Sequence, residues 1–171
     1  VCSSDLHILD LVVDYVTCVV VPVVMFLKLD LLTGTSSYIY AGLIIFTGAL
    51  WFARTDQETE DHWFNGFPAA WNIVIPTFII LGTREDYVIA SIIALCAISL
   101  TKLKFPHLVK VTFLRPLTWS LAIIYFVALT LLSVKYPDGP TYLKPILVFF
   151  PIYIFTISSY HSWKVRQTSV N

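Results

Sequence analysis

Six apolar segments, separated by short connections with charge, proline or glycine, constrain the fold of this 171-residue chain more than any other feature. They lie at about 8–27, 37–53, 67–82, 87–101, 117–134 and 145–163. A helix needs about 20 apolar residues to cross a bilayer, so the third and fourth segments are short for a span. The pattern predicts an all-α fold, a polytopic membrane bundle of about six transmembrane helices.

The composition supports a membrane protein. Hydrophobic residues make up 57% of the chain and charged residues 13%, and the mean hydropathy is +0.78, which excludes an ordinary soluble domain. The formal net charge is zero, so nothing indicates a nucleic-acid partner. The three cysteines have no metal-ligand spacing, and we expect neither a disulfide framework nor a zinc site.

The start of the chain is unusual. It begins with Val1 and not with Met, and the first apolar segment follows within a few residues. We expect residues 1–6 to be non-native sequence. We expect residues 7–171 to form a single membrane domain that is incomplete at its N-terminus.

Two aspartates lie inside the first apolar segment, at Asp10 and Asp14. A carboxylate in a membrane span costs roughly 2.5–3.5 kcal/mol, and it persists where it faces a cavity, a metal or a partner. On a helix, residues four apart share one face, so both carboxylates can hold one cation or share a proton. A simpler alternative is that Asp10 lies at a wet helix start, where the helix dipole favours an acid.

Basic residues predict the orientation of the chain in the membrane. The side on which the first segment starts carries seven of them, and the opposite side carries four. The seven are Arg54, Lys102, Lys104, Lys110, Arg115, Lys164 and Arg166. Because cytoplasmic loops are enriched in Lys and Arg, this side is predicted to be cytoplasmic, and Asp10 and Asp14 lie near it.

Two noncatalytic interpretations of the aspartate pair stay open. A small transporter or proton relay also places carboxylates within a span, with helices broken by prolines such as Pro22, Pro76 and Pro151. In a membrane scaffold, the aspartates would only pair with polar neighbours.

Several stretches resemble one enzyme family. Asp10-Leu-Val-Val-Asp14 is similar to the last aspartate pair of the CDP-alcohol phosphotransferase fingerprint. Around it, LDLVVDYVTCVVVP, DHWFNGFPAAWNIV at 61–74 and FPHLVKVTFLRPLTW at 105–119 resemble the choline-using bacterial branch of that family, in the same order. The earlier Asp-Gly-x-x-Ala-Arg half of the fingerprint is missing, and Leu6 occupies its glycine position.

The resemblance implies a reaction and a location. Such enzymes transfer a phosphatidyl group from CDP-diacylglycerol to an alcohol and release CMP, and this branch would form phosphatidylcholine from choline. It implies Mn²⁺ or Mg²⁺ as cofactor, Asp10 and Asp14 as metal ligands, and Asp14 as the catalytic base. The enzyme would lie in the bacterial inner membrane with its active site facing the cytoplasm, and a chain without half of the metal site would be inactive.

Other outcomes of the resemblance stay open. Serine or glycerol phosphate is the acceptor in other members of the family. A homodimer is one of the assemblies that the sequence leaves open.

Aromatic residues near position 65 are candidates for choline binding. A quaternary ammonium cannot donate a hydrogen bond, and aromatic faces and anionic charge hold it best. The residues around Gly66 supply both: Asp61, Trp63, Phe64, Phe67 and Trp71. The alternative is an aromatic belt at the membrane interface.

Two basic residues in the segment KLKFPHLVKVTFLRP, Lys110 and Arg115, are candidates for binding lipid phosphates. Cytoplasmic lysines and arginines attract anionic headgroups. Membrane topology alone is an equally good explanation for them.

Overall fold

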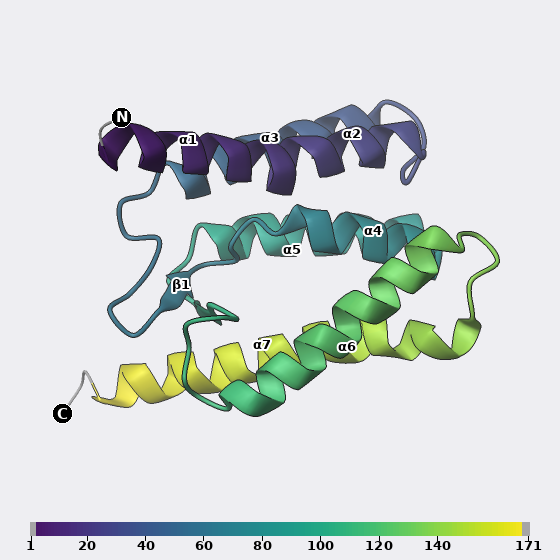
Figure 1. Ribbon diagram of the computed structural model, residues 1–171. Coiled ribbons are helices and arrows are strands. Elements are labelled where there is room, and N and C mark those ends of the chain that lie inside the picture. The colour runs from purple at the N-terminus through teal and green to yellow at the C-terminus, as the bar shows by residue number, and fades with distance from the viewer. Residues whose placement is uncertain (1–2, 169–171) are drawn as a thin grey trace. The chain divides into compact units, whose positions relative to one another are not determined.

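The computed structural model describes residues 3–168, so Val1 and Cys2 of the predicted non-native stretch and the last three residues of the predicted domain lie outside the described residues. Seven α-helices appear along the described chain (Figure 1). They are α1 (Ser3–Tyr15), α2 (Val21–Lys28), α3 (Ser36–Phe52), α4 (Trp71–Leu81), α5 (Glu85–Ser99), α6 (Arg115–Val134) and α7 (Lys144–Thr168). A π-helical turn, η1 (Val16–Val20), joins α1 to α2, and a short 3-10 turn, η2 (Thr141–Leu143), precedes α7.

The helices agree with the six apolar segments to within a few residues. The first segment corresponds to the α1–η1–α2 rod, and each later segment corresponds to one helix. The mainly helical prediction is therefore confirmed, but all-α was too simple. A two-stranded antiparallel sheet pairs β1 (Trp63–Asn65) with β2 (Lys104–Pro106).

Three helical segments within residues 3–168 are long and apolar enough to cross a membrane: Asp5–Lys28, Arg115–Val134 and Thr141–Gln167. Ser36–Phe52 and Trp71–Leu81 are apolar but shorter. A membrane protein is thus supported by length and composition. The number of six spans stays a prediction.

The chain divides into two compact units, which are described separately. The first comprises Val1–Thr55 with Phe67–Leu100, and the second comprises Asp56–Gly66 with Thr101–Asn171. The single domain expected from the sequence stays a prediction.

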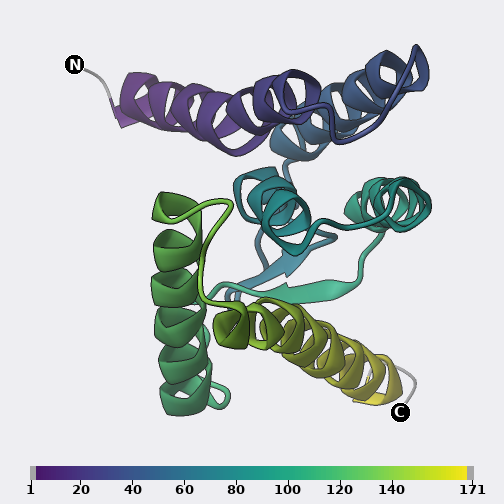
Figure 2. The ribbon, with the colours of Figure 1, turned by 90° about the vertical axis from the view of Figure 1, so that its right-hand side faces the viewer.

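In the first unit, the α1–η1–α2 rod packs along α3, α4 packs on α2, and α5 packs on α3. The rod and α3 run side by side in Figures 1 and 2. Its core contains Val19, Phe26, Ile44, Trp71 and Ile92, each fully buried. Outward-facing apolar side chains cover the other faces of these helices, as expected where lipid replaces water as the solvent.

The π-helical turn has a local cause. Pro22 has no N–H, so the carbonyl of Cys18, four residues earlier, loses its usual helical donor, and the proline ring crowds that carbonyl. A wider turn over Val16–Val20 relieves this conflict. Thr17 Oγ1 also donates to the carbonyls of Val13 (2.8 Å) and Asp14 (3.3 Å). The helical turn is therefore wider from Val16 onward, two residues after Asp14.

A glycine lets α3 approach this turn closely. A Cβ atom at Gly48 would lie 2.9 Å from Val19 Cγ2, closer than real Cβ contacts allow. Val19 is β-branched and has little rotamer freedom in a helix, so it cannot easily move away. Gly48 thus fixes the contact between α3 and η1.

In the second unit, the sheet lies against α7, and α6 packs on α7 (Figure 2). Trp63 is opposite Pro106 and Asn65 is opposite Lys104. The backbone N–H of Lys104 donates to Ser162 Oγ on α7 (2.8 Å). Gly66 directly follows β1 and has φ +82°, a left-handed conformation that glycine adopts without strain.

Gly48→Ala should lower the thermal unfolding temperature of the detergent-purified protein. Overpacking costs roughly 1–3 kcal/mol, which exceeds the helix-propensity gain of about 1 kcal/mol from Gly to Ala. Adding Val19→Ala should recover much of the loss. Gly42→Ala, in the same helix with no atom within 4 Å of the new Cβ, should have no destabilising effect. Equal melting of Gly48→Ala and the unmodified protein would contradict the close contact.

Candidate functional site

Asp10 and Asp14 lie one helical turn apart on α1, and both are exposed. Within residues 3–168, neither carboxylate has a hydrogen bond or a salt bridge. Tyr15 anchors this part of the helix, because its hydroxyl donates to the Ile45 carbonyl of α3 (3.1 Å). Its ring also meets Phe52 edge-on, with centroids 5.8 Å apart. The acids are therefore held on a fixed helix face, and they remain free to bind a ligand.

The donor chemistry of this pair fits a hard divalent cation. Carboxylate oxygens are the ligands that Mg²⁺ prefers, and Mn²⁺ accepts them as well. Two carboxylates supply only part of a coordination shell. In the part of the chain that the structure describes, no group of three or more His, Cys, Asp or Glu side chains is placed to hold a metal.

A second group of polar and aromatic side chains gathers around the sheet of the second unit. Trp63 is 2% exposed, and its ring stacks on that of His161 with centroids 3.8 Å apart and an interplanar angle of 2°. Asp61 Oδ2 lies 3.3 Å from His161 Nε2, an ion pair when the imidazole is protonated. The Phe64 ring instead stacks over His107, with centroids 5.0 Å apart.

These residues border a cavity of about 270 Å³. Both segments of the sheet region and the end of α7 contribute to it. Its lining residues are Asp61, Trp63, Val111, Thr112, Phe113, Tyr160, His161, Lys164 and Val165. The cavity thus combines aromatic rings with an acid and a base.

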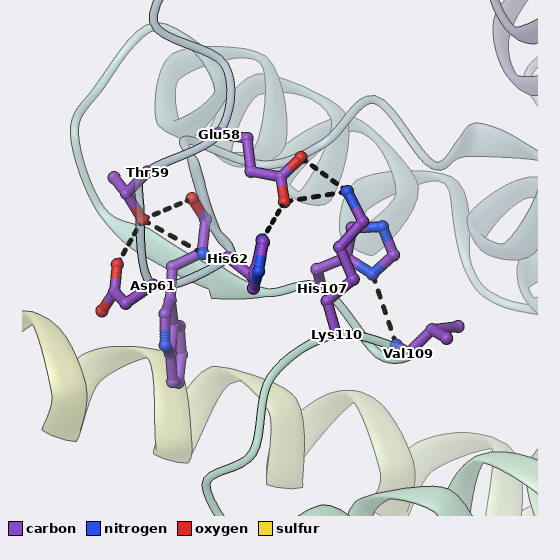
Figure 3. Close-up of polar contacts among 8 residues, drawn as sticks. Glu58, Thr59, Asp61, His62, His107, Val109 and Lys110 are labelled. Carbon is purple, nitrogen blue, oxygen red and sulfur yellow. Dashed lines mark hydrogen bonds and ion pairs between the residues drawn. The ribbon is translucent and has the colours of Figure 1, made fainter.

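A network of charged residues holds the two loops beside this sheet together (Figure 3). Lys110 Nζ lies 3.0 Å from both oxygens of Glu58, and His62 Nδ1 lies 2.7 Å from Glu58 Oε1. The backbone N–H of His107 donates to the His62 carbonyl (3.2 Å). These contacts thereby join the loop that contains Glu58 and His62 to the loop that contains His107 and Lys110.

The same contacts shift the titration of several groups. Partial burial raises the pKa of the Glu58 carboxyl, but the hydrogen bonds from Lys110 and His62 outweigh it, and the pKa lies below its usual value. The pKa of Asp61 is also lowered, because the hydrogen bond from Thr59 and the charge of His161 outweigh burial. Burial and then the charge of Lys110 lower the pKa of His107.

The remaining predicted site residues have other surroundings. Trp71 is fully buried at the start of α4 in the first unit, edge-on to Phe67, so its ring offers no exposed face. Arg115 begins α6, is exposed, and lies over the Trp119 ring at 5.1 Å. Asp61 and Trp63 line one cavity, whereas Phe64, Lys110 and Arg115 are not among its lining residues. The roles assigned to all of them stay predictions.

Bacterial proteins that share the name phosphatidylcholine synthase are similar to this chain along most of its length. It is 31% identical to the phosphatidylcholine synthase of Pseudomonas aeruginosa over 133 residues, which are 78% of this chain and 56% of that protein. It is 26% identical to the phosphatidylcholine synthase of Borreliella burgdorferi over 165 residues, 95% of this chain and 70% of that protein. The chain is a homologue of bacterial phosphatidylcholine synthases. The family resemblance seen in the sequence is thereby confirmed.

Similarity to the phosphatidylcholine synthase of Rhizobium meliloti, 34% over 121 residues, covers 70% of this chain and 49% of that protein. The chain spans about half the length of the curated relatives it matches. No family model matches the chain, and no solved structure matches it. Because these relatives are phosphatidylcholine synthases, the comparisons do not favour the transporter interpretation or an acceptor alcohol other than choline.

Two structural features were missing from the sequence prediction. They are the π-helical turn Val16–Val20 and the position of His161 and Tyr160 at the cavity that Trp63 lines. Pro22 was the signal for the turn, because an internal proline removes a helical hydrogen bond. The α7 residues carried no local signal, because only the contact of α7 with β2 brings them to Trp63.

Glu58→Gln should speed hydrogen exchange of the β1 and β2 backbone amides at neutral pH, because a neutral amide cannot form an ion pair with Lys110. The pKa of the Glu58 carboxyl is lower in the folded chain than in the unfolded chain, where it is near 4.5. The ionised carboxylate therefore stabilises the fold at a pH above the unfolded-state pKa, and this stabilisation is lost as the pH falls through the folded-state pKa. Exchange in variant and unmodified protein should therefore converge in acid.

Glu60→Gln is the matched control, because Glu60 is an exposed acid of the same loop. Its exchange pattern should not change. A Glu58→Gln effect of the same size at neutral and acid pH would rule out the ion pair as its origin.

Proposed function

We propose that the protein containing this chain transfers the phosphatidyl group of CDP-diacylglycerol to choline and releases CMP, forming phosphatidylcholine. The observation that carries the proposal is similarity to phosphatidylcholine synthases over 78% or more of the chain in two relatives. The paired carboxylates on one face of α1 supply the chemistry that such a transfer needs.

Asp14 is proposed as the general base. An ionised carboxylate within hydrogen-bond range of the choline hydroxyl takes its proton as the oxygen attacks the phosphorus that bears diacylglycerol. The bond from that phosphorus to the CMP oxygen breaks, and CMP leaves. A π-helical turn begins at Val16, two residues after Asp14, and such turns are frequently found at functional sites in helices.

Asp10 is proposed as a ligand for Mn²⁺ or Mg²⁺, together with Asp14. When bound, such a cation neutralises the charge that develops as the phosphoanhydride breaks. Asp10 and Asp14 present oxygen donors from consecutive turns of a single rigid helix. Their missing protein partners within residues 3–168 agree with carboxylates kept for a ligand.

The enzyme is proposed to lie in the bacterial inner membrane with these acids facing the cytoplasm. Asp5–Lys28 is one of the three helical segments suited to a span, and the acids lie in its first half. The predicted cytoplasmic side also carries the larger number of basic residues, as the positive-inside rule requires. CDP-diacylglycerol and choline would then be reached from the membrane and the cytoplasm, respectively.

Asp14→Asn in the full-length gene product should reduce choline-dependent CMP release from CDP-diacylglycerol by roughly a hundredfold or more, since general-base catalysis contributes about 10²–10⁴ in rate. Asparagine keeps the size of the side chain but cannot accept the proton. The loss should fall on kcat, with less change in KM. A rate within a few-fold of the unmodified enzyme would show that the base lies elsewhere.

Asp10→Asn should instead shift the activation curve to higher Mn²⁺ or Mg²⁺ concentration, because one ligand oxygen loses its charge. Asp30→Asn is the control, as Asp30 is an exposed acid of the same unit in the connection after α2. Metal titration of CMP release should be unchanged for Asp30→Asn. Identical metal curves for Asp10→Asn and the unmodified enzyme would remove Asp10 from the metal site.

A further inference from the structure

The cavity beside Trp63 carries both signs of charge as well as aromatic rings. Asp61 and Lys164 both line it, and the low pKa of Asp61 keeps that carboxylate ionised at neutral pH. Asp61 also contacts Thr59 and His161, and its negative charge attracts a cation, whereas the positive charge of Lys164 attracts an anion. A ligand with both a cation and an anion can therefore interact with both side chains.

Aromatic rings indicate which cation the cavity suits. Phe113 and Tyr160 are 40% and 51% exposed, and their rings are nearly parallel, with centroids 6.2 Å apart. Such exposed aromatic faces attract a quaternary ammonium, which cannot donate a hydrogen bond. Trp63 and His161, stacked on each other, also line the cavity and are much less exposed.

Position and size narrow the ligand further. Tyr160 and His161 lie four and three residues before Lys164 near the end of α7, so each shares a helix face with Lys164, in a helix suited to a membrane span. The ends of spans lie at the level of lipid headgroups. At about 270 Å³, the cavity is smaller than the roughly 300–1,000 Å³ typical of drug-sized ligands, and it suits a headgroup.

From this geometry we propose that the cavity binds a phosphocholine zwitterion, with its quaternary ammonium against Asp61 and the rings of Phe113 and Tyr160, and its phosphate against Lys164. Phosphocholine is present both as a soluble compound and as the headgroup of phosphatidylcholine. That the lipid is the natural source rests on the proposed function, because the lipid is its product. The enzyme would thus hold the headgroup of its own product at the end of α7.

Binding can be measured by isothermal titration of the detergent-purified full-length protein that carries Asp14→Asn, so that no turnover interferes. The probes are soluble phosphocholine, choline, and the dihexanoyl forms of phosphatidylcholine and phosphatidylglycerol below their micelle concentrations. We expect phosphatidylcholine to bind and phosphatidylglycerol, which has no ammonium, not to bind. Binding of soluble phosphocholine as well would show that the headgroup alone is sufficient, and binding of the lipid alone would assign the site to the membrane.

Three variants test the contacts. Tyr160→Leu and Phe113→Leu should each weaken phosphatidylcholine binding by about threefold to thirtyfold, the range for loss of a cation–π contact. Lys164→Met should remove the preference for phosphocholine over choline, because only the phosphate needs the cation.

Tyr142→Leu, an exposed tyrosine of the same unit outside the cavity, is the matched control and should bind like the parent protein. Thermal unfolding of each variant separates loss of binding from loss of fold. If either Tyr160→Leu or Phe113→Leu fails to fold, the other still tests the aromatic contact.

The proposal is overturned if the parent protein binds neither phosphocholine probe, if phosphatidylglycerol binds as tightly as phosphatidylcholine, or if folded ring variants bind unchanged. Its failure is separable from that of the proposed function. Choline-dependent CMP release is measured on the protein with Asp14 intact. Headgroup binding without any CMP release would leave this site standing, and CMP release without headgroup binding would leave the reaction standing.

Discussion

Pairing of β1 with β2 is the interaction on which the second unit depends. Only three residue pairs form the sheet, yet it joins segments about 40 residues apart in sequence. The Lys104 N–H bond to Ser162 then attaches the sheet to α7, which places Trp63 on the ring of His161. The Glu58–Lys110 ion pair closes the loops on the other side. The cavity is lined by residues of the β1 segment, of the connection between β2 and α6, and of α7.

Helix positions were predictable because a bilayer requires long apolar runs with all backbone hydrogen bonds satisfied internally, and breakers mark their ends. The first segment was predicted at 8–27, and the rod spans residues 3–28 in the structure. The strands Trp63–Asn65 and Lys104–Pro106 were not predictable, since three residues are too few to show an alternating pattern. Because the strand was not predictable, neither was the separation of the aromatic residues expected to bind choline. Trp71 lies in a helix core, while Trp63 belongs to the sheet.

The two candidate regions are supported by different kinds of observation. Asp10 and Asp14 share a helix face by simple periodicity, so the sequence alone indicated their chemistry, and the structure added the proline-induced π turn that follows them. The cavity beside Trp63 has no sequence motif, because its lining comes from three separate segments. The proposed function connects both to phosphatidylcholine synthesis, and the charges in the cavity suit the headgroup of that lipid.

Labelled choline tests the central claim most directly. The full-length gene product would be expressed in a bacterium that makes CDP-diacylglycerol but no phosphatidylcholine, with deuterated choline in the medium, and membrane lipids would be analysed by mass spectrometry. We predict phosphatidylcholine that carries the intact deuterated headgroup, absent from cells with the empty vector. Expression of the protein in the membrane with no deuterium in any lipid would contradict the account.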